Sequence, residues 1–170
     1  MSALGDTRFR NVPLGEDALF CLEVYMRDLR IRCTDVNIYR YTINDGQATR
    51  KRNPKAMRKA VQSYESIFDI VKQYQNSISD DTELSSCFDR WIANMFTPFI
   101  SRVLSSDLSK KEFIEITQRF EKKGIIPIEE TGKKQKVYNF ICRYPQLYPI
   151  ESYLYQHLFV PYILPKLSRN

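Results

Sequence analysis

Several residue types are scarce in this chain, and each shortage excludes a class of protein. Among 170 residues there is one histidine, His157, and no two of the four cysteines form a CxxC pair, so a structural zinc site is not expected. Five glycines are too few for the many turns of a β-sandwich. There is no run of about 18 apolar residues and no apolar leader, so we expect neither a membrane-spanning helix nor a signal peptide. These absences predict a cytoplasmic protein with buried free thiols at Cys21, Cys33, Cys87 and Cys142.

Positive charge is abundant but concentrated in one part of the chain. The net charge is +6, and residues 27–59 alone hold ten basic and three acidic residues. Such a local field favours an anionic partner, namely phosphate groups, an anionic membrane surface or nucleic acid. No RNP-like, KH or helix-turn-helix pattern is legible, so we do not expect nucleic acid to be that partner.

The most informative stretch is a glycine turn followed by two adjacent carboxylates. Gly15 precedes Glu16 and Asp17, and an apolar series at helical spacing predicts a helix from residue 16 or 17 to about residue 30. The helix dipole and the free N–H groups of the first turn favour a carboxylate anion there. Taken by itself, Asp17 is either a helix cap or a general base.

Short strands and then a series of helices are predicted after this stretch. Residues 31–33 and 36–41 alternate as strands do. Asn53-Pro54 begins a helix to about residue 76, Asp80 with Glu83 begins the next, and Ser109 with Glu112 forms a capping box. Pro98 should kink or split the second of these helices, and Gly124 should end the third. The expected buried faces are Met57, Val61, Tyr64, Phe68 and Val71, then Leu84, Phe88, Trp91, Met95, Phe99 and Val103.

The last segment is rich in tyrosine and is divided into short helices by Pro145, Pro149, Pro161 and Pro165. Its tyrosines either pack a small helical bundle or lie at the headgroup level of a membrane. The fold class is therefore mainly α, with one helix and short strands before residue 53 and a helical bundle after it. Two short strands cannot form a stable sheet by themselves, so the first part is expected to belong to a larger α/β domain.

The order of these features resembles the end of the catalytic domain of glycosyltransferase family 2, whose nucleotide-sugar-binding fold is of the GT-A type. Many bacterial members build surface polysaccharides. They carry a phenylalanine-containing segment, an acidic ED pair that opens a helix, and a strand that ends in a Tyr-Arg pair. Here those pieces are residues 6–9, 15–20 and 36–44. The resemblance covers about the first third of the chain.

The resemblance implies roles for particular residues. Asp17 would be the base that removes the proton from an acceptor hydroxyl during inverting displacement of a nucleoside diphosphate, with Glu16 as a positioning carboxylate. Arg50 and Arg52 would contact the diphosphate or an anionic lipid-linked acceptor, and Tyr41 would also line the substrate site. For the two arginines, a solvated charge cluster before a helix is the alternative.

The resemblance also implies a part that these residues do not contain. The family holds Mg²⁺ or Mn²⁺ through a DxD motif, and no DxD occurs in the 170 residues, so no metal or cofactor is expected in this chain itself. We expect residues 1–52 to be the C-terminal end of the catalytic domain and residues 53–170 to be a helical extension, inactive without the nucleotide-binding half. The expected partners are a nucleotide-sugar donor, a saccharide acceptor and the inner face of the membrane. The alternative is a non-catalytic helical protein-interaction module with a basic patch.

Overall fold

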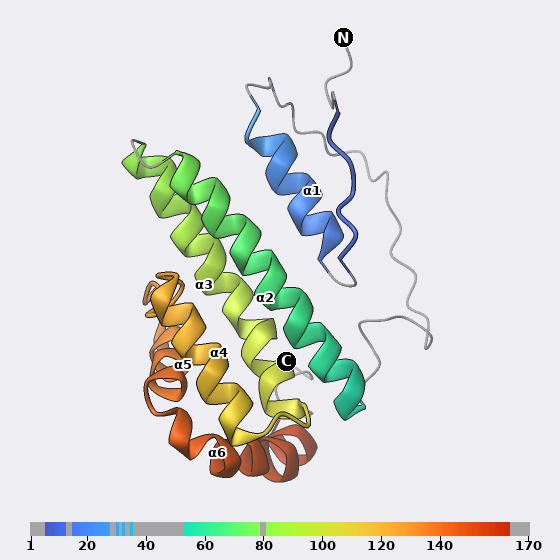
Figure 1. Ribbon diagram of the computed structural model, residues 1–170, viewed down its shortest axis with the longest axis vertical. Coiled ribbons are helices and arrows are strands. Elements are labelled where there is room, and N and C mark those ends of the chain that lie inside the picture. The colour runs from blue at the N-terminus through green and yellow to red at the C-terminus, as the bar shows by residue number, and fades with distance from the viewer. Residues whose placement is uncertain are drawn as a thin grey trace. The chain divides into compact units, whose positions relative to one another are not determined.

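The computed structural model of the chain describes residues 6–12, 15–27, 30, 32, 35, 53–78 and 81–163. Two compact units are present, residues 1–51 and residues 52–170. All regular structure in the described residues is helical, in the order shown in Figure 1. The expectation of a mainly α protein is therefore confirmed. The strands expected at 31–33 and 36–41 fall almost wholly outside the described residues and stay a prediction.

The first unit contains helix α1, Glu16–Tyr25. This helix is shorter than expected, since Met26 already occupies the C-cap position and donates its N–H to the Leu22 carbonyl. The segment before the helix lies along it: the rings of Phe9 and Phe20 stack with centroids 4.4 Å apart. Leu19 is fully buried.

Helix α2, Pro54–Ser77, begins as the sequence predicts. Asn53 is the N-cap, and its side-chain oxygen accepts a hydrogen bond of 2.8 Å from the Ala56 N–H. Every member of the expected apolar series is buried, which confirms that face: Met57, Val61, Tyr64, Phe68 and Val71.

Helix α3, Thr82–Ser105, continues through Pro98 without being split, and its N-cap and its buried face differ from the expectation. Its N-cap is Asp81 rather than Asp80, and Asp81 accepts from the Leu84 N–H at 2.9 Å. Leu84 is exposed, while Trp91 and Met95 are only half-buried. Phe88, Phe99 and Val103 are buried as expected. Because α3 packs against α2, α5, α6 and η3, its buried arc is wider and also contains Ile92, Ala93, Phe96, Ile100 and Leu104.

Four phenylalanines form the centre of the second unit. The ring of Phe68 on α2 lies 5.3 Å from Phe96 and 5.5 Å from Phe99 on α3. Phe120, from helix α4, lies 5.6 Å from Phe68, with the ring planes at 86°. All four rings are almost completely buried. Such edge-to-face contacts add to the stabilisation that comes from burial alone, so this cluster joins three helices into one core.

Helix α4, Lys110–Lys122, has the two ends that its sequence predicts. Ser109 and Glu112 form a reciprocal capping box. At the other end Gly124 has φ 63°, and the N–H groups of Gly124 and Ile125 donate to Glu121 and Phe120 carbonyls at 3.0 and 2.9 Å. This is a Schellman motif, in which glycine is favoured because the left-handed conformation strains other residues.

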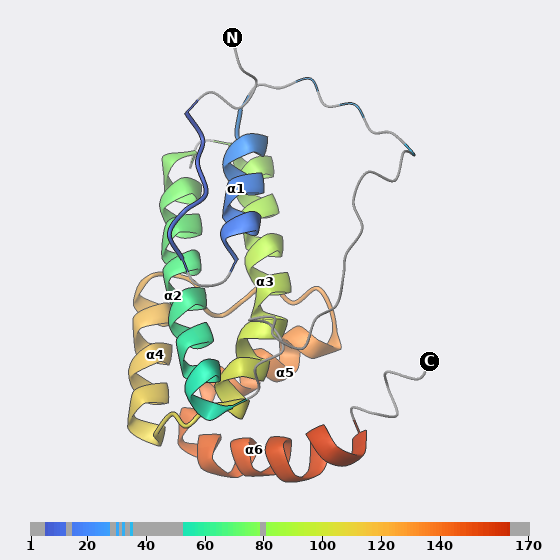
Figure 2. The same ribbon diagram turned by 90° about the vertical axis from the view of Figure 1, so that its right-hand side faces the viewer.

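The chain then crosses the end of the helical bundle. Helix α5, Lys133–Arg143, is followed by a 3-10 turn η2, Pro145–Leu147, helix α6, Tyr148–Leu154, and a π-helix η3, Tyr155–Ile163. Pro145 and Pro149 begin elements as expected, but Pro161 lies inside η3 and does not end it. Figures 1 and 2 show α6 lying across the end of the unit opposite the α2–α3 turn. None of the helices in the described ranges is both long and apolar enough to cross a membrane.

Truncating the central ring should reveal how much the second unit depends on it. Phe68→Ala is expected to lower the free energy of unfolding by about 3–5 kcal/mol, because it removes a large buried side chain and leaves a cavity between three helices. Urea denaturation followed by circular dichroism measures the change. The control is Leu84→Ala on the exposed side of α3, which should cost about 0.5 kcal/mol or less. Equal losses in the two variants would contradict a core centred on Phe68.

Candidate functional site

The acidic helix start is built on a left-handed glycine. Gly15 has φ 83° and ψ 15°, provides no side-chain cap, and accepts the first helical hydrogen bond from the Leu19 N–H at 3.1 Å. Only glycine adopts this backbone conformation without strain. The turn places Glu16 and Asp17 in the first turn of α1, and both side chains are exposed.

One oxygen of Asp17 is engaged and the other is available. Asp17 Oδ1 accepts a hydrogen bond of 2.8 Å from the Ala18 N–H. Within the part of the chain that the structure describes, Asp17 has no ion-pair partner and its second oxygen has no hydrogen-bond donor. Asp17 therefore is not the N-cap, which is Gly15. An exposed carboxylate with a free oxygen can accept a proton from a molecule that approaches the helix start.

A ring stack and an ion pair are among the contacts that hold α1 against the preceding segment. The rings of Phe9 and Phe20 stack with their planes inclined by 11°. Arg10 Nε forms an ion pair with Glu23 Oε1 at 2.7 Å. The phenylalanine-containing segment and the acidic helix thus lie side by side within the first unit, as Figure 1 shows. The remaining expected substrate residues, Tyr41, Arg50 and Arg52, lie outside the described residues.

One member of the basic stretch is neutralised within the second unit. Arg58 on α2 donates from Nε to Asp107 Oδ1 at 2.7 Å and from Nη1 to the Glu112 carboxylate on α4. The hydrogen bond from Arg58, followed by those from Ser109, lowers the pKa of Glu112 to about 2. Arg58 in turn has its pKa raised by these two carboxylates, Glu112 first. Arg58 is therefore a link between α2 and α4 and is not available to an anionic ligand.

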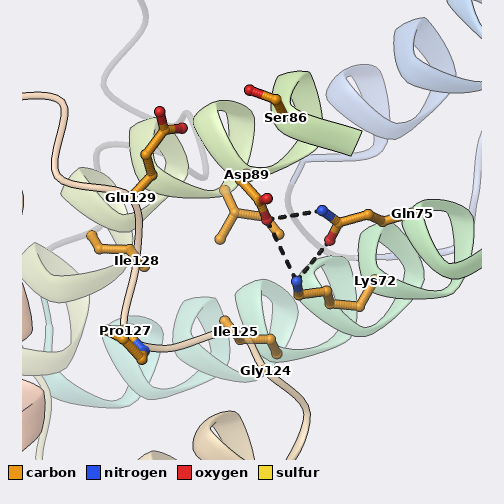
Figure 3. Close-up of a pocket in the computed structure, with 10 residues that line it drawn as sticks. Lys72, Gln75, Ser86, Asp89, Gly124, Ile125, Pro127, Ile128 and Glu129 are labelled. Atoms are coloured by element: carbon orange, nitrogen blue, oxygen red, sulfur yellow. Dashed lines mark hydrogen bonds and ion pairs between the residues drawn. The ribbon is translucent and has the colours of Figure 1, made fainter. Parts of the chain in front are cut away.

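A polar cluster that the sequence analysis did not identify joins α2 and α3. Figure 3 shows Lys72 and Gln75 of α2 facing Asp89 of α3. Lys72 Nζ donates to Gln75 Oε1 at 2.7 Å, and Gln75 Nε2 donates to Asp89 Oδ1 at 2.9 Å. Lys72 and Asp89 form an ion pair at 3.6 Å. The signal was in the sequence: Gln75 continues the buried series of α2, four residues after Val71.

An open cavity of about 540 Å³ lies beside this cluster. The loop from Gly124 to Glu129 forms its other side, as Figure 3 shows. Lys72 is neutralised by Asp89, and the buried amide of Gln75 is satisfied by Ser85 as well as Asp89. Because the polar groups satisfy one another, the cluster has no free charge for an anionic ligand. We assign it to the pairing of α2 with α3.

The cysteines and the histidine do not form a reactive centre in the described residues. Burial, with a smaller contribution from Glu151, raises the pKa of Cys142 to about 12, so its thiol stays protonated and is a poor nucleophile. Cys21 and Cys87 are free and exposed, so the expectation of buried thiols is confirmed at Cys142 and wrong at these two. Both side chains lie outside the buried face of their helices. Cys33 lies outside the described residues, and His157 is exposed with its ring 4.5 Å from that of Tyr153.

A metal site is likewise not formed by the residues that the structure describes. No group of three or more His, Cys, Asp or Glu side chains is placed there to hold an ion.

No family model, curated protein or solved structure matches the chain. The candidate site is therefore defined by its own geometry: an exposed carboxylate pair at a helix start, held by a stacked phenylalanine pair.

The link between Arg58 and Glu112 predicts a pH-dependent contribution to stability. A carboxyl whose pKa is lowered in the folded state stabilises the protein above its ordinary pKa, and this contribution is lost as the pH falls from about 4.5 to about 2. Glu112→Gln keeps a side chain that can complete a capping box but removes the charge. Because both side chains are partly exposed, the expected loss at pH 7 is about 0.5–1 kcal/mol.

Urea denaturation at pH 7 and at pH 3 tests this expectation. The difference between Glu112→Gln and the unchanged protein should be smaller at pH 3. The control is Glu115→Gln, an exposed position on the same helix, which should show little difference at either pH. A loss of stability in Glu112→Gln that is equally large at both pH values would contradict the ion-pair explanation.

Proposed function

We propose that this chain is the C-terminal part of an inverting glycosyltransferase of family 2 and that Asp17 is its general base. The reaction would transfer a sugar from a nucleotide-sugar donor to a saccharide or lipid-linked acceptor. The observation that carries the proposal is the exposed Glu16–Asp17 pair in the first turn of α1. The Phe9 segment packed along the same helix supports it, because both pieces belong to the sequence pattern from which the family resemblance was inferred.

The proposed chemistry assigns one proton transfer to this chain. The acceptor hydroxyl donates a hydrogen bond to the free oxygen of Asp17. As the hydroxyl oxygen bonds to the anomeric carbon, its proton passes to Asp17, and the bond from that carbon to the diphosphate oxygen breaks on the opposite face. The diphosphate leaves with the electron pair, so the configuration at the anomeric carbon is inverted. Glu16, which is adjacent and also exposed, would orient the acceptor.

Donor binding belongs elsewhere in this proposal. The described residues do not fit a metal, since they have no ligand group for one, and no step above depends on a metal. A Mg²⁺ or Mn²⁺ ion would be held by the nucleotide-binding half. Arg50, Arg52 and Tyr41 are retained as proposed contacts to the diphosphate or the acceptor. The second unit would then be a helical extension of the catalytic domain.

Asp17→Asn tests the proposal in an enzyme that combines this chain with its nucleotide-binding half. Asparagine preserves the size of the side chain but cannot take the proton. The turnover number is expected to fall by about 10²–10⁴-fold, the usual contribution of a general base. Donor affinity, measured by calorimetry with the nucleotide sugar, should be unchanged.

The matched control is Glu83→Gln, which changes another exposed carboxylate in the first turn of a helix, α3. Turnover should be unaffected there. Full turnover in Asp17→Asn would mean that Asp17 serves only the start of α1, and the proposal would then fail.

A further inference from the structure

Three side chains of α6 and η3 donate hydrogen bonds to the C-terminal end of α3. Ser152 Oγ and Gln156 Nε2 both donate to the Leu104 carbonyl, at 3.0 and 2.8 Å. Tyr148 donates from its hydroxyl to the Val103 carbonyl at 3.1 Å. The last carbonyls of a helix have no partner within that helix. The polar face of α6 and η3 is therefore used to satisfy the C-terminal end of α3.

Most of the exposed side chains of the same helix are apolar, although Gln156 and His157 are exposed as well. Five large side chains on it are between 49% and 65% exposed, and we call them the outer stripe: Ile150, Tyr153, Leu154, Leu158 and Tyr162. Leu154, Leu158 and Tyr162 are four residues apart, a spacing that keeps them nearly aligned along a π-helix. A helix at the surface of a globular protein ordinarily turns its apolar face to the core. Tyr148 does so, because it is buried against Phe113, but the outer stripe faces away from the core.

The neighbouring helix α5 supplies positive charge and further apolar groups. From residue 132 to residue 163 the chain has four basic residues and one carboxylate. Lys133 and Lys134 are exposed and have no ion-pair partner among the described residues. Val137 and Phe140, on the same helix, are half exposed. A basic helix with exposed apolar residues is typical of a segment that lies on a membrane surface.

Glu151 is the only carboxylate between residues 132 and 163, and it would repel an anionic surface only weakly. Glu151 is half-buried, and its Oε2 atom is buried without a hydrogen-bond partner within the described ranges. Burial raises the pKa of Glu151. The positive charge of α5 is therefore the dominant electrostatic feature from residue 132 to residue 163.

We propose that the outer stripe binds the headgroup region of an anionic lipid bilayer, with α6 and η3 lying parallel to the surface and α5 drawn to it by charge. Tyr153 and Tyr162 suit this depth, because tyrosine combines an apolar ring with a hydroxyl that stays hydrated. Leu154 and Leu158 would enter the acyl boundary. The proposal concerns the second unit alone and does not depend on the glycosyltransferase chemistry.

Vesicle flotation with the 170-residue chain tests the proposal. The chain should float with vesicles of phosphatidylcholine mixed with phosphatidylglycerol, bind phosphatidylcholine alone much more weakly, and be released by salt. Leu154→Gln/Leu158→Gln should lower the partition coefficient by about tenfold or more, since two apolar side chains no longer enter the boundary. The control Leu84→Gln changes an exposed leucine on α3 and should bind normally. Circular dichroism confirms that both variants are folded.

A second pair of variants tests the charge. Lys133→Gln/Lys134→Gln should lower binding to the anionic vesicles by about tenfold or more, because each lysine near such a surface contributes roughly fivefold. Arg90→Gln/Lys122→Gln, at exposed positions on α3 and in the last turn of α4, makes the same change in net charge away from the stripe and should have a smaller effect.

Three results would overturn the proposal. The first is absence of binding to either vesicle by the unchanged chain. The second is equal binding by Leu154→Gln/Leu158→Gln. The third is a dimer in light scattering that the same variant dissociates, without vesicle binding, which would make a second copy of the chain the occupant of the stripe.

Discussion

The contact on which the second unit depends is the meeting of Phe68 with Phe96, Phe99 and Phe120. These rings come from three helices and lie 5.1–6.1 Å apart. Burial of large aromatic side chains supplies the main favourable term, and the edge-to-face geometry fixes how the helices meet. Once α3 is held in this way, its C-terminal end has a defined position, and the remainder of the unit is assembled on that end.

The C-terminal end of α3 determines which side chains of α6 and η3 face inward. Ser152 and Gln156 donate to the Leu104 carbonyl, and Tyr148 donates to the Val103 carbonyl, which also accepts from Ser106. A helix that turns these groups inward leaves its apolar residues outside, where they remain exposed unless another surface covers them. The proposed membrane contact therefore follows from the same geometry that completes the bundle. The proposed proton transfer to Asp17, in the first unit, does not depend on this geometry.

Features set by adjacent residues could be predicted from the sequence, and features set by packing between helices could not. The capping box of Ser109 depends on four consecutive residues, and the acidic start of α1 at Asp17 depends on three, so both were evident. The burial of Phe96 in place of Trp91 depends on the helices that pack against α3, which sequence spacing does not identify. The place of Gln75 on the buried side of α2 follows from its spacing after Val71, but its partner Asp89 depends on the pairing of α2 with α3. The role of Asp17 stays a prediction, because its other expected partners lie outside the described residues.

Our central claim is that the outer stripe of α6 and η3 contacts a bilayer. The depth of position 158 in the bilayer tests this claim most directly. The chain has one tryptophan, Trp91, so Leu158→Trp in a Trp91→Phe background gives a single fluorescent reporter. The same substitution at Glu115, exposed on α4, gives the control. With anionic vesicles that contain brominated lipid, our account predicts strong quenching of the tryptophan at position 158 and little at position 115. Equal quenching at the two positions, or none at position 158, would contradict it.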